Sequence, residues 1–144
     1  MNVLLESDIL ISIKPEYTLK IMNGEKKVEF RKKFTTNFDN FTKFYIYCSN
    51  PIKKIVGYFI VTRIEWIHPK CLWEKYKTIG GIDEKRFFEY FQNREIGFAL
   101  VIHKFYKLEE YFNPYLGFEH FTAPQSYYFL NKERMKILEG LKIE

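Results

Sequence analysis

The chain has 144 residues, 47% of them hydrophobic, which is enough for one core and too little for two comfortable domains. Its 23 Lys and Arg against 18 Asp and Glu give a net charge of +5, which favours polyanionic partners without identifying one. Two cysteines exclude a secreted disulfide scaffold and no apolar run is long enough for a membrane span, so we expect a single cytoplasmic domain over residues 1–144 with no membrane partner.

The first predicted elements are a buried strand and a short helix. Residues 8–13 are apolar and β-branched, as in a buried strand. Pro15 suits the first turn of a following helix, because a missing N–H is tolerated there. Asn23 and Gly24 supply a left-handed end to that helix.

The next segment, KKVEFRK, alternates strictly and predicts a half-buried strand. Val28 and Phe30 face the core, whereas the other face carries Lys27, Glu29 and Arg31. Charges on a partly buried face are costly unless they pair with each other or with a ligand. Glu29 and Arg31 are the obvious pair. A solvated edge strand protected by lysines is the alternative interpretation.

The rest of the chain alternates between strands and short helices. Gly57 is expected to relieve a bend or bulge in a long strand, and Asp83 is expected to cap a helix. Strands are predicted at 43–49, 52–67 and 96–108, and helices at 68–77, 80–92 and 131–141. Strands interrupted by short helices, without a regular βαβ rhythm, predict a small α+β barrel.

Four charged residues are candidates for a nucleic-acid site. Lys14, Lys26 and Arg31 offer donors for phosphate, and Arg31 can grip two oxygens or a base edge. Glu29 binds phosphate poorly, but its carboxylate can orient a cation or accept hydrogen bonds from the exocyclic amine of a base.

Aromatic and small polar residues extend this set. Unpaired bases are usually read by stacking on rings, and three residues could provide them, although each is also a reasonable packing residue: Tyr45, Tyr47 and Trp73. Ser49 shares a strand face with Tyr47. Gln125 and Ser126 follow Pro124 in a turn and can point polar groups into a cleft, or they can cap a helix.

The segment IKPEYTLKIMNGEKKVEFRK resembles the opening pattern of the ASCH domain, a member of the PUA-like superfamily. The resemblance continues through IYCSNPIKKIVGYF, GGIDEKRFFEYF, IGFALVI and FTAPQSYYFL, and so covers nearly the whole chain. It implies a mostly antiparallel β-barrel with flanking short helices, and a cleft between barrel and helix where relatives are thought to hold RNA or a nucleotide. Lys14, Pro15 and the strand from Gly24 to Arg31 would line that cleft.

The same resemblance raises an enzymatic alternative. Some ASCH proteins are similar in this segment to an acetylcytidine amidohydrolase that uses a lysine, a threonine and a glutamate. Lys26 matches the lysine, but Glu29 stands at the threonine position and removes the hydroxyl nucleophile. A variant mechanism would use Glu29 as general base and Lys26 to stabilise an oxyanion, which requires the turn after Gly24 to bring the two together.

We therefore predict an RNA-binding or modified-nucleotide-binding domain, with an amidohydrolase on an acylated nucleoside as one alternative. A regulatory protein-interaction module using the aromatic segment 111–121 is the other. We expect no metal or cofactor, because His68 and Cys71 have too few partners, and no paired-carboxylate motif of a metal nuclease is present. Glu6 and Asp8 interrupt the opening segment, which argues against a signal peptide.

Overall fold

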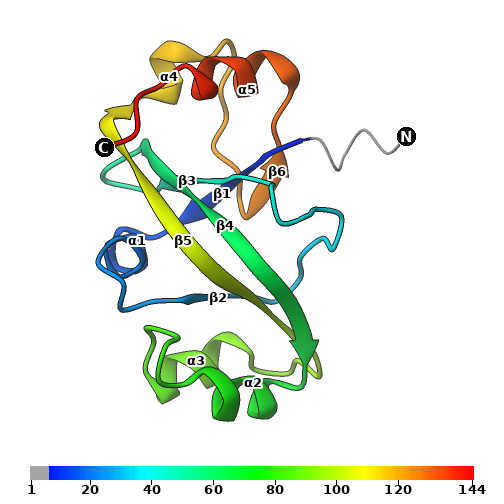
Figure 1. The fold of residues 1–144 in the computed structure, drawn as a ribbon. Coiled ribbons are helices and arrows are strands. Elements are labelled where there is room, and N and C mark those ends of the chain that lie inside the picture. Colours follow the sequence, from blue (N-terminus) through cyan, green and yellow to red (C-terminus); the bar gives the residue numbers. More distant parts are fainter. Residues whose placement is uncertain (1–6) are drawn as a thin grey trace.

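The alternating strands form a six-stranded mixed sheet in residues 7–144, the part of the chain that the computed structural model describes (Figure 1). Residues 1–6, including Glu6, lie outside this part. The strand order is β2-β5-β4-β3-β1-β6, and β1 with β3 is the single parallel pairing in the described sheet. The strands are β1 (Ile9–Ile13), β2 (Val28–Arg31), β3 (Phe44–Cys48), β4 (Lys54–Ile67), β5 (Gly97–Phe112) and β6 (Tyr127–Phe129).

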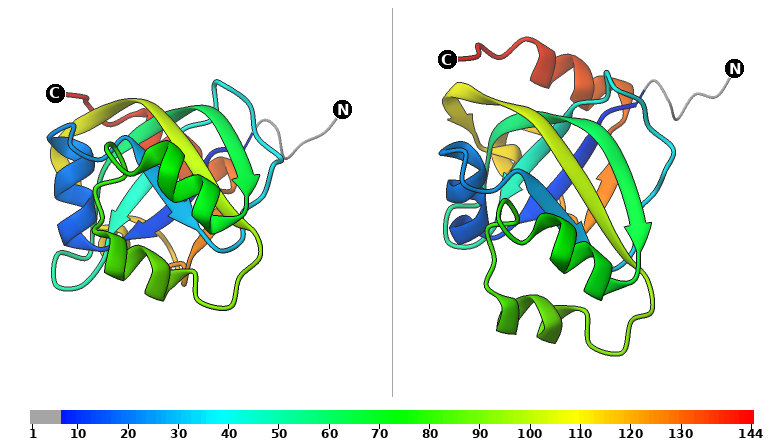
Figure 2. Two further views of the ribbon diagram at one scale, coloured as in Figure 1. Left: turned by 90° about the horizontal axis from the view of Figure 1, so that it is seen from below. Right: turned by 60° about the horizontal axis from the view of Figure 1, so that its bottom comes forward.

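Short helices pack around the sheet. They are α1 (Pro15–Met22), α2 (Pro69–Tyr76), α3 (Glu84–Tyr90), α4 (Pro114–Gly117) and α5 (Lys132–Glu139). Helices α2 and α3 lie beyond β2 at one end, and α4 and α5 lie at the other (Figures 1 and 2). The Asp83 side chain accepts a hydrogen bond from the Arg86 N–H, which confirms the predicted cap. Across residues 7–144, no helix is long and apolar enough to cross a membrane.

The sheet curls on itself, so its two edge strands, β2 and β6, approach each other around the inner core (Figure 2). Irregular register beside Gly57 helps to bend the long strands β4 and β5. The interior of the curl is filled by side chains of β1 and β3 such as Ile9, Ile11, Phe44 and Ile46. The predicted α+β fold with a small barrel is confirmed, and the barrel is open along the seam between β2 and the β1–β6 pair.

Two further clusters attach the helices to the outside of the curl. Leu10, Tyr45 and Tyr47, on the outward face of β1 and β3, pack with residues of the C-terminal segment such as Leu130 and Leu138. Val28 and Phe30 pack with rings of α2 and α3, as the alternation in this strand predicts. Strand β6, helix α4 and the extension of β5 to Phe112 were not predicted.

We expect Gly57→Ala to lower the free energy of unfolding by about 2 kcal/mol, because overpacking a tight site forces the backbone to shift. A Cβ at this position would collide with the Tyr106 carbonyl oxygen and the Phe105 ring. Urea denaturation measures the effect. Gly140→Ala is the matched control: its Cβ would have no atom nearer than 3.5 Å, so stability should change by less than about 0.5 kcal/mol. Equal stability of the two variants would contradict this packing.

Candidate functional site

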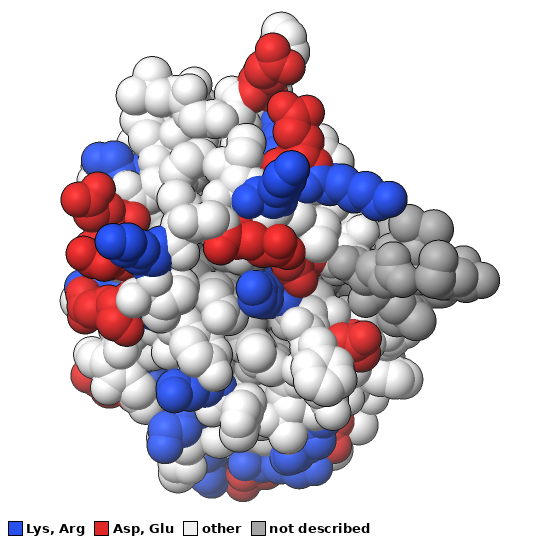
Figure 3. Space-filling view, turned by 45° about the horizontal axis from the view of Figure 1, so that its top comes forward, with Lys and Arg blue, Asp and Glu red and all other residues white. Residues whose placement is uncertain are grey.

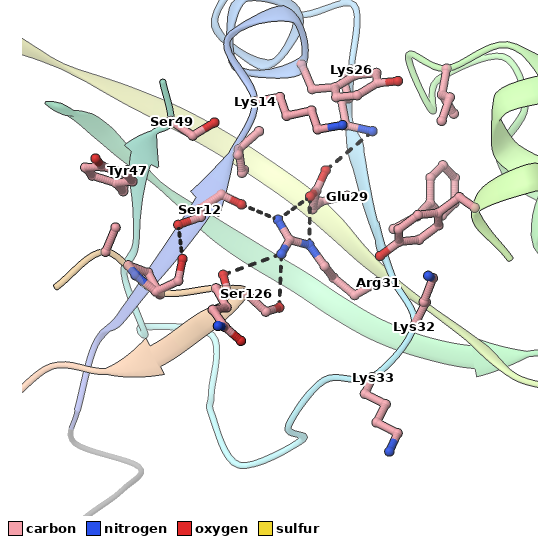
Figure 4. Close-up of a pocket in the computed structure, with 18 of the residues that line it drawn as sticks. Ser12, Lys14, Lys26, Glu29, Arg31, Lys32, Lys33, Tyr47, Ser49 and Ser126 are labelled. Carbon is pink, nitrogen blue, oxygen red and sulfur yellow. Dashed lines mark hydrogen bonds and ion pairs between the residues drawn. The ribbon is translucent and has the colours of Figure 1, made fainter. Parts of the chain in front are cut away.

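The seam of the curled sheet opens into a cleft with a volume of about 1150 Å³ (Figure 4). One wall comes from α1, β2 and α3, and the other from the ends of β1 and β3 and the segment before β6. Eight Lys or Arg residues and two Glu residues line it: Lys14, Lys26, Arg31, Lys32, Lys33, Lys53, Arg86, Arg94, Glu29 and Glu89.

Arg31 bridges the seam at the floor of this cleft. Its Nε and Nη2 atoms donate to Glu29 Oε2 at 2.9 and 2.7 Å, and Nη2 also donates to the Ser12 carbonyl oxygen of β1 at 2.7 Å. On the β6 side, Nη1 lies 3.2 Å from Ser126 Oγ and 3.5 Å from the Ser126 carbonyl oxygen (Figure 4). These five hydrogen bonds match the five N–H groups of a guanidinium. Phosphate binding by Arg31 stays a prediction, and an anion there would have to displace one of these partners.

Lys26 pairs with the same carboxylate from the other side. Its Nζ lies 3.5 Å from Glu29 Oε1 and donates to the Gly80 carbonyl oxygen at 2.6 Å. Strand β2 begins only at Val28, so Lys26 belongs to the preceding turn and can face Glu29 despite their odd spacing. The convergence that the amidohydrolase alternative requires is therefore present.

Burial changes the chemistry of Lys26. Its side chain is 3% exposed, and desolvation lowers its pKa while the nearby Glu29 carboxylate opposes that shift. Gly81, at φ +65°, lies directly against it, and a Cβ there would come within 2.7 Å of Lys26 Cβ. The Gly80-Gly81 turn thus fits around the lysine side chain and supplies its backbone acceptor.

The other predicted site residues divide into two groups. Five of them line the cleft with the charged trio: Lys14, Tyr47, Ser49, Gln125 and Ser126. Trp73 is not among the lining residues and packs on Phe87 and Phe88 in the helical cluster. Tyr45 and Tyr47 are 1% and 3% exposed, so both rings are packing residues, the alternative given above, and only the hydroxyl end of Tyr47 reaches the cleft.

Several lining residues were missing from the predicted set. Lys53 comes from the turn before β4 and adopts a positive φ of 56°, and its exposed amine lies near the Tyr115 ring. Lys32 and Lys33 continue the chain beyond β2, and Arg94 follows α3. The basic run at 31–33 was the available signal for two of them, whereas no local pattern distinguished Lys53 or Arg94.

A pair of phenols lies at the β3 end of the cleft. The Tyr47 and Tyr115 hydroxyls are 2.7 Å apart. Burial, followed by this hydrogen bond, raises the pKa of Tyr47, so its hydroxyl keeps its proton at neutral pH. Within residues 7–144, no group of three or more His, Cys, Asp or Glu is placed to hold a metal ion.

We expect Arg31→Ala to lower the free energy of unfolding by about 3 kcal/mol, because it leaves Glu29 Oε2 and three backbone or hydroxyl oxygens of Ser12 and Ser126 without their donor. Urea denaturation measures the loss, and Lys33→Ala, which removes an exposed charge two residues away, should change stability by less than about 0.5 kcal/mol. An Arg31→Ala protein as stable as the control would contradict the bridge.

Comparison with known proteins finds chains similar to this one. No family model matches the sequence. An ASCH domain-containing ribonuclease of Zymomonas mobilis is 26% identical over 136 residues, covering 93% of this chain and 91% of the relative. The large ribosomal subunit protein uL22 of Ureaplasma parvum is 32% identical over 107 residues, but this chain spans only 33% of it.

Solved structures show the same architecture. The crystal structure of ASCH from Zymomonas mobilis superposes with a TM-score of 0.82 at 24% identity, covering 94% of this chain and 96% of that one. A serine-to-alanine mutant of that protein gives a TM-score of 0.84, also at 24% identity, with the same coverage. The chain is thus similar to an ASCH domain-containing ribonuclease along nearly its full length and has the fold of the solved ASCH structures, which supports the predicted ASCH domain.

Proposed function

We propose that the cleft binds single-stranded RNA. One observation carries the proposal: the excess positive charge of the chain is concentrated there. Eight Lys or Arg and two Glu line the cleft, and taking these from the totals of 23 and 18 leaves 15 Lys and Arg and 16 Asp and Glu elsewhere. The face bearing α4 and α5 shows the contrast, since positive and negative side chains are intermixed on it (Figure 3).

The cleft separates two kinds of cation. Lys26 and Arg31 are engaged by Glu29 and by backbone oxygens, so the floor holds two cations and one carboxylate whose hydrogen-bonding groups are largely paired with each other or with the backbone. Lys14 and Lys53 are exposed at the rim. The exposed rim lysines are best placed to bind phosphates, while polar groups of the floor can form hydrogen bonds with the edge of a base. Glu29 Oε1, which faces Lys26 and not Arg31, is the acceptor we assign to an exocyclic amine.

RNA cleavage is a second candidate function, favoured by the ribonuclease description of the Zymomonas mobilis relative. No histidine is among the described residues that line the cleft, so acid–base roles fall to other groups. The raised pKa of Tyr47 keeps its hydroxyl protonated and makes it a weak acid, so its role is to donate a hydrogen bond to a leaving oxygen. The exposed Lys53 amine can stabilise the charge that develops on phosphorus-bound oxygens.

The amidohydrolase alternative has weaker support in this cleft. Lys26 and Glu29 converge as it requires, but the Lys26 amine is almost fully buried and bonded to Gly80. It must leave that backbone oxygen before it can reach a substrate carbonyl. A protein-interaction role for residues 111–121 has partial support, since Leu116 is 86% exposed, while Tyr115 faces the cleft. Modified-nucleotide binding and a cytoplasmic location stay predictions.

We expect Lys14→Ala/Lys53→Ala to weaken binding of single-stranded RNA about tenfold and to reduce the slope of log K against log salt by roughly 1 to 1.5, because two phosphate contacts are lost. Fluorescence anisotropy with a labelled oligonucleotide, repeated at several salt concentrations, measures both quantities. Lys70→Ala/Lys136→Ala removes two exposed lysines outside the cleft and should leave both unchanged. The same loss in both variants would mean that the cleft is not the binding site.

For cleavage, we expect Tyr47→Phe to slow product formation on single-stranded RNA at least tenfold while the affinity changes less than about twofold. Removal of the hydroxyl keeps the ring that packs on Phe121. Tyr106→Phe, on β5 outside the cleft, is the matched control. Wild-type protein that binds RNA but releases no product would confine the function to binding.

A further inference from the structure

We propose that Lys32, Lys33 and Arg94 form a second phosphate subsite at the far lip of the cleft, so that the ligand is a strand of several nucleotides and not a single nucleotide. The inference rests on the proposed function and specifies its substrate. It assigns a role to three cations whose side chains form no hydrogen bond or ion pair with Lys26, Glu29 or Arg31 at the floor of the cleft.

All three cations line the same cleft. Strand β2 ends at Arg31, so Lys32 and Lys33 carry the wall past the bridge across the seam. In the close-up, Lys14 lies on one side of the Glu29 and Arg31 pair, and Lys32 and Lys33 lie on the other (Figure 4). Arg94 joins the same wall from the turn after α3, where its N–H donates to the Phe91 carbonyl oxygen.

The charges of these three side chains are available to a ligand. All three side chains are exposed, and among the described residues none of them lies within ion-pair distance of a carboxylate. Arg86, on the same wall, is instead held by both Glu16 oxygens at 2.9 and 3.0 Å. The remaining carboxylate lining this wall is Glu89, so the far lip keeps a net positive charge.

The ammonium group of Lys32 is also held in place by an aromatic ring. Lys32 Nζ lies 4.9 Å from the centroid of the Tyr90 ring, a cation–π arrangement that limits the freedom of the side chain. Tyr90 packs edge to face on Phe91, which belongs to the buried helical cluster. A cation held beside a fixed ring loses less conformational entropy when it binds a phosphate oxygen.

The cleft floor separates Lys14 at the rim from the three cations of the far lip. Every N–H of Arg31 has a partner, so the floor between Lys14 and Lys32 offers no free guanidinium to a phosphate. A strand that engages both Lys14 and the far lip must therefore cross a stretch where Arg31 has no free donor for a phosphate, and a base can occupy it. The cleft volume of about 1150 Å³ lies above the range of roughly 300–1,000 Å³ common for small-molecule sites, as expected for a polymer segment.

The test compares RNA length. Anisotropy titrations use labelled oligouridylates of two and eight nucleotides at several salt concentrations, with wild type, Lys32→Ala/Lys33→Ala/Arg94→Ala, and the control Lys70→Ala/Lys85→Ala/Lys136→Ala. The control removes the same charge from exposed positions outside the cleft. We expect the far-lip variant to bind the octamer at least tenfold more weakly, with a salt slope smaller by about 2, and to bind the dinucleotide within about twofold of wild type.

Three outcomes contradict the proposal in distinguishable ways. Wild type that binds the dinucleotide as tightly as the octamer would overturn the second subsite while leaving RNA binding intact. A far-lip variant that matches the control on the octamer would do the same. Wild type that binds neither length with a salt dependence would overturn the proposed function and this inference together. Circular dichroism melts of the two variants verify that both are folded.

Discussion

The hydrogen-bonded bridge of Arg31 across the open seam is the constraint on which the cleft depends. The sheet has two free edges, and a curled sheet with free edges needs something other than backbone pairing to hold them together. Arg31 supplies this by binding Glu29 on its own strand, Ser12 on β1 and Ser126 beside β6. A buried ion pair is stabilising only where nearly every donor and acceptor is satisfied, and here the five guanidinium N–H groups are. The primary role of the charged residues of β2 is therefore to hold the two edges of the sheet together.

That arrangement divides the positive charge of the cleft into two populations with different physics. Lys26 and Arg31 sit in a low-dielectric setting, fixed by Glu29 and backbone oxygens, and they respond little to salt. Lys14, Lys53 and the far-lip cations are exposed, so their attraction for a polyanion is long-ranged and screened by salt. A rigid polar floor between two charged rims suits a ligand whose phosphates and bases must be held at different depths. The exposed cations at both ends of the cleft therefore favour an RNA strand of several nucleotides over a single nucleotide.

Local patterns predicted much of the fold and part of the site. Alternation placed β2 and β3 correctly, and Pro15 with Gly24 marked the limits of α1, because these signals depend on neighbours in sequence. The pairing of Glu29 with Arg31 followed from the cost of burying either alone. What Arg31 reaches beyond Glu29 could not be predicted, since Ser126 is 95 residues away and comes close only when the sheet curls. Trp73 shows a second limit of local patterns. Its helix was predicted, but the sequence did not show that its ring packs against Phe87 of α3. Lys53 gave no local signal because its place depends on where the β3–β4 turn ends relative to the seam.

The most direct measurement of the central claim is the side-chain Nε–H signal of Arg31 in ¹⁵N–¹H NMR spectra, recorded before and after saturation with single-stranded RNA. The account predicts a signal that exchanges slowly with water in the free protein and barely shifts on binding, while the ammonium signals of the rim lysines change. A rapidly exchanging Arg31 signal in the free protein, or one that moves as far as those of the rim lysines when RNA is added, would show that the guanidinium is a ligand contact and not the fastening of the seam.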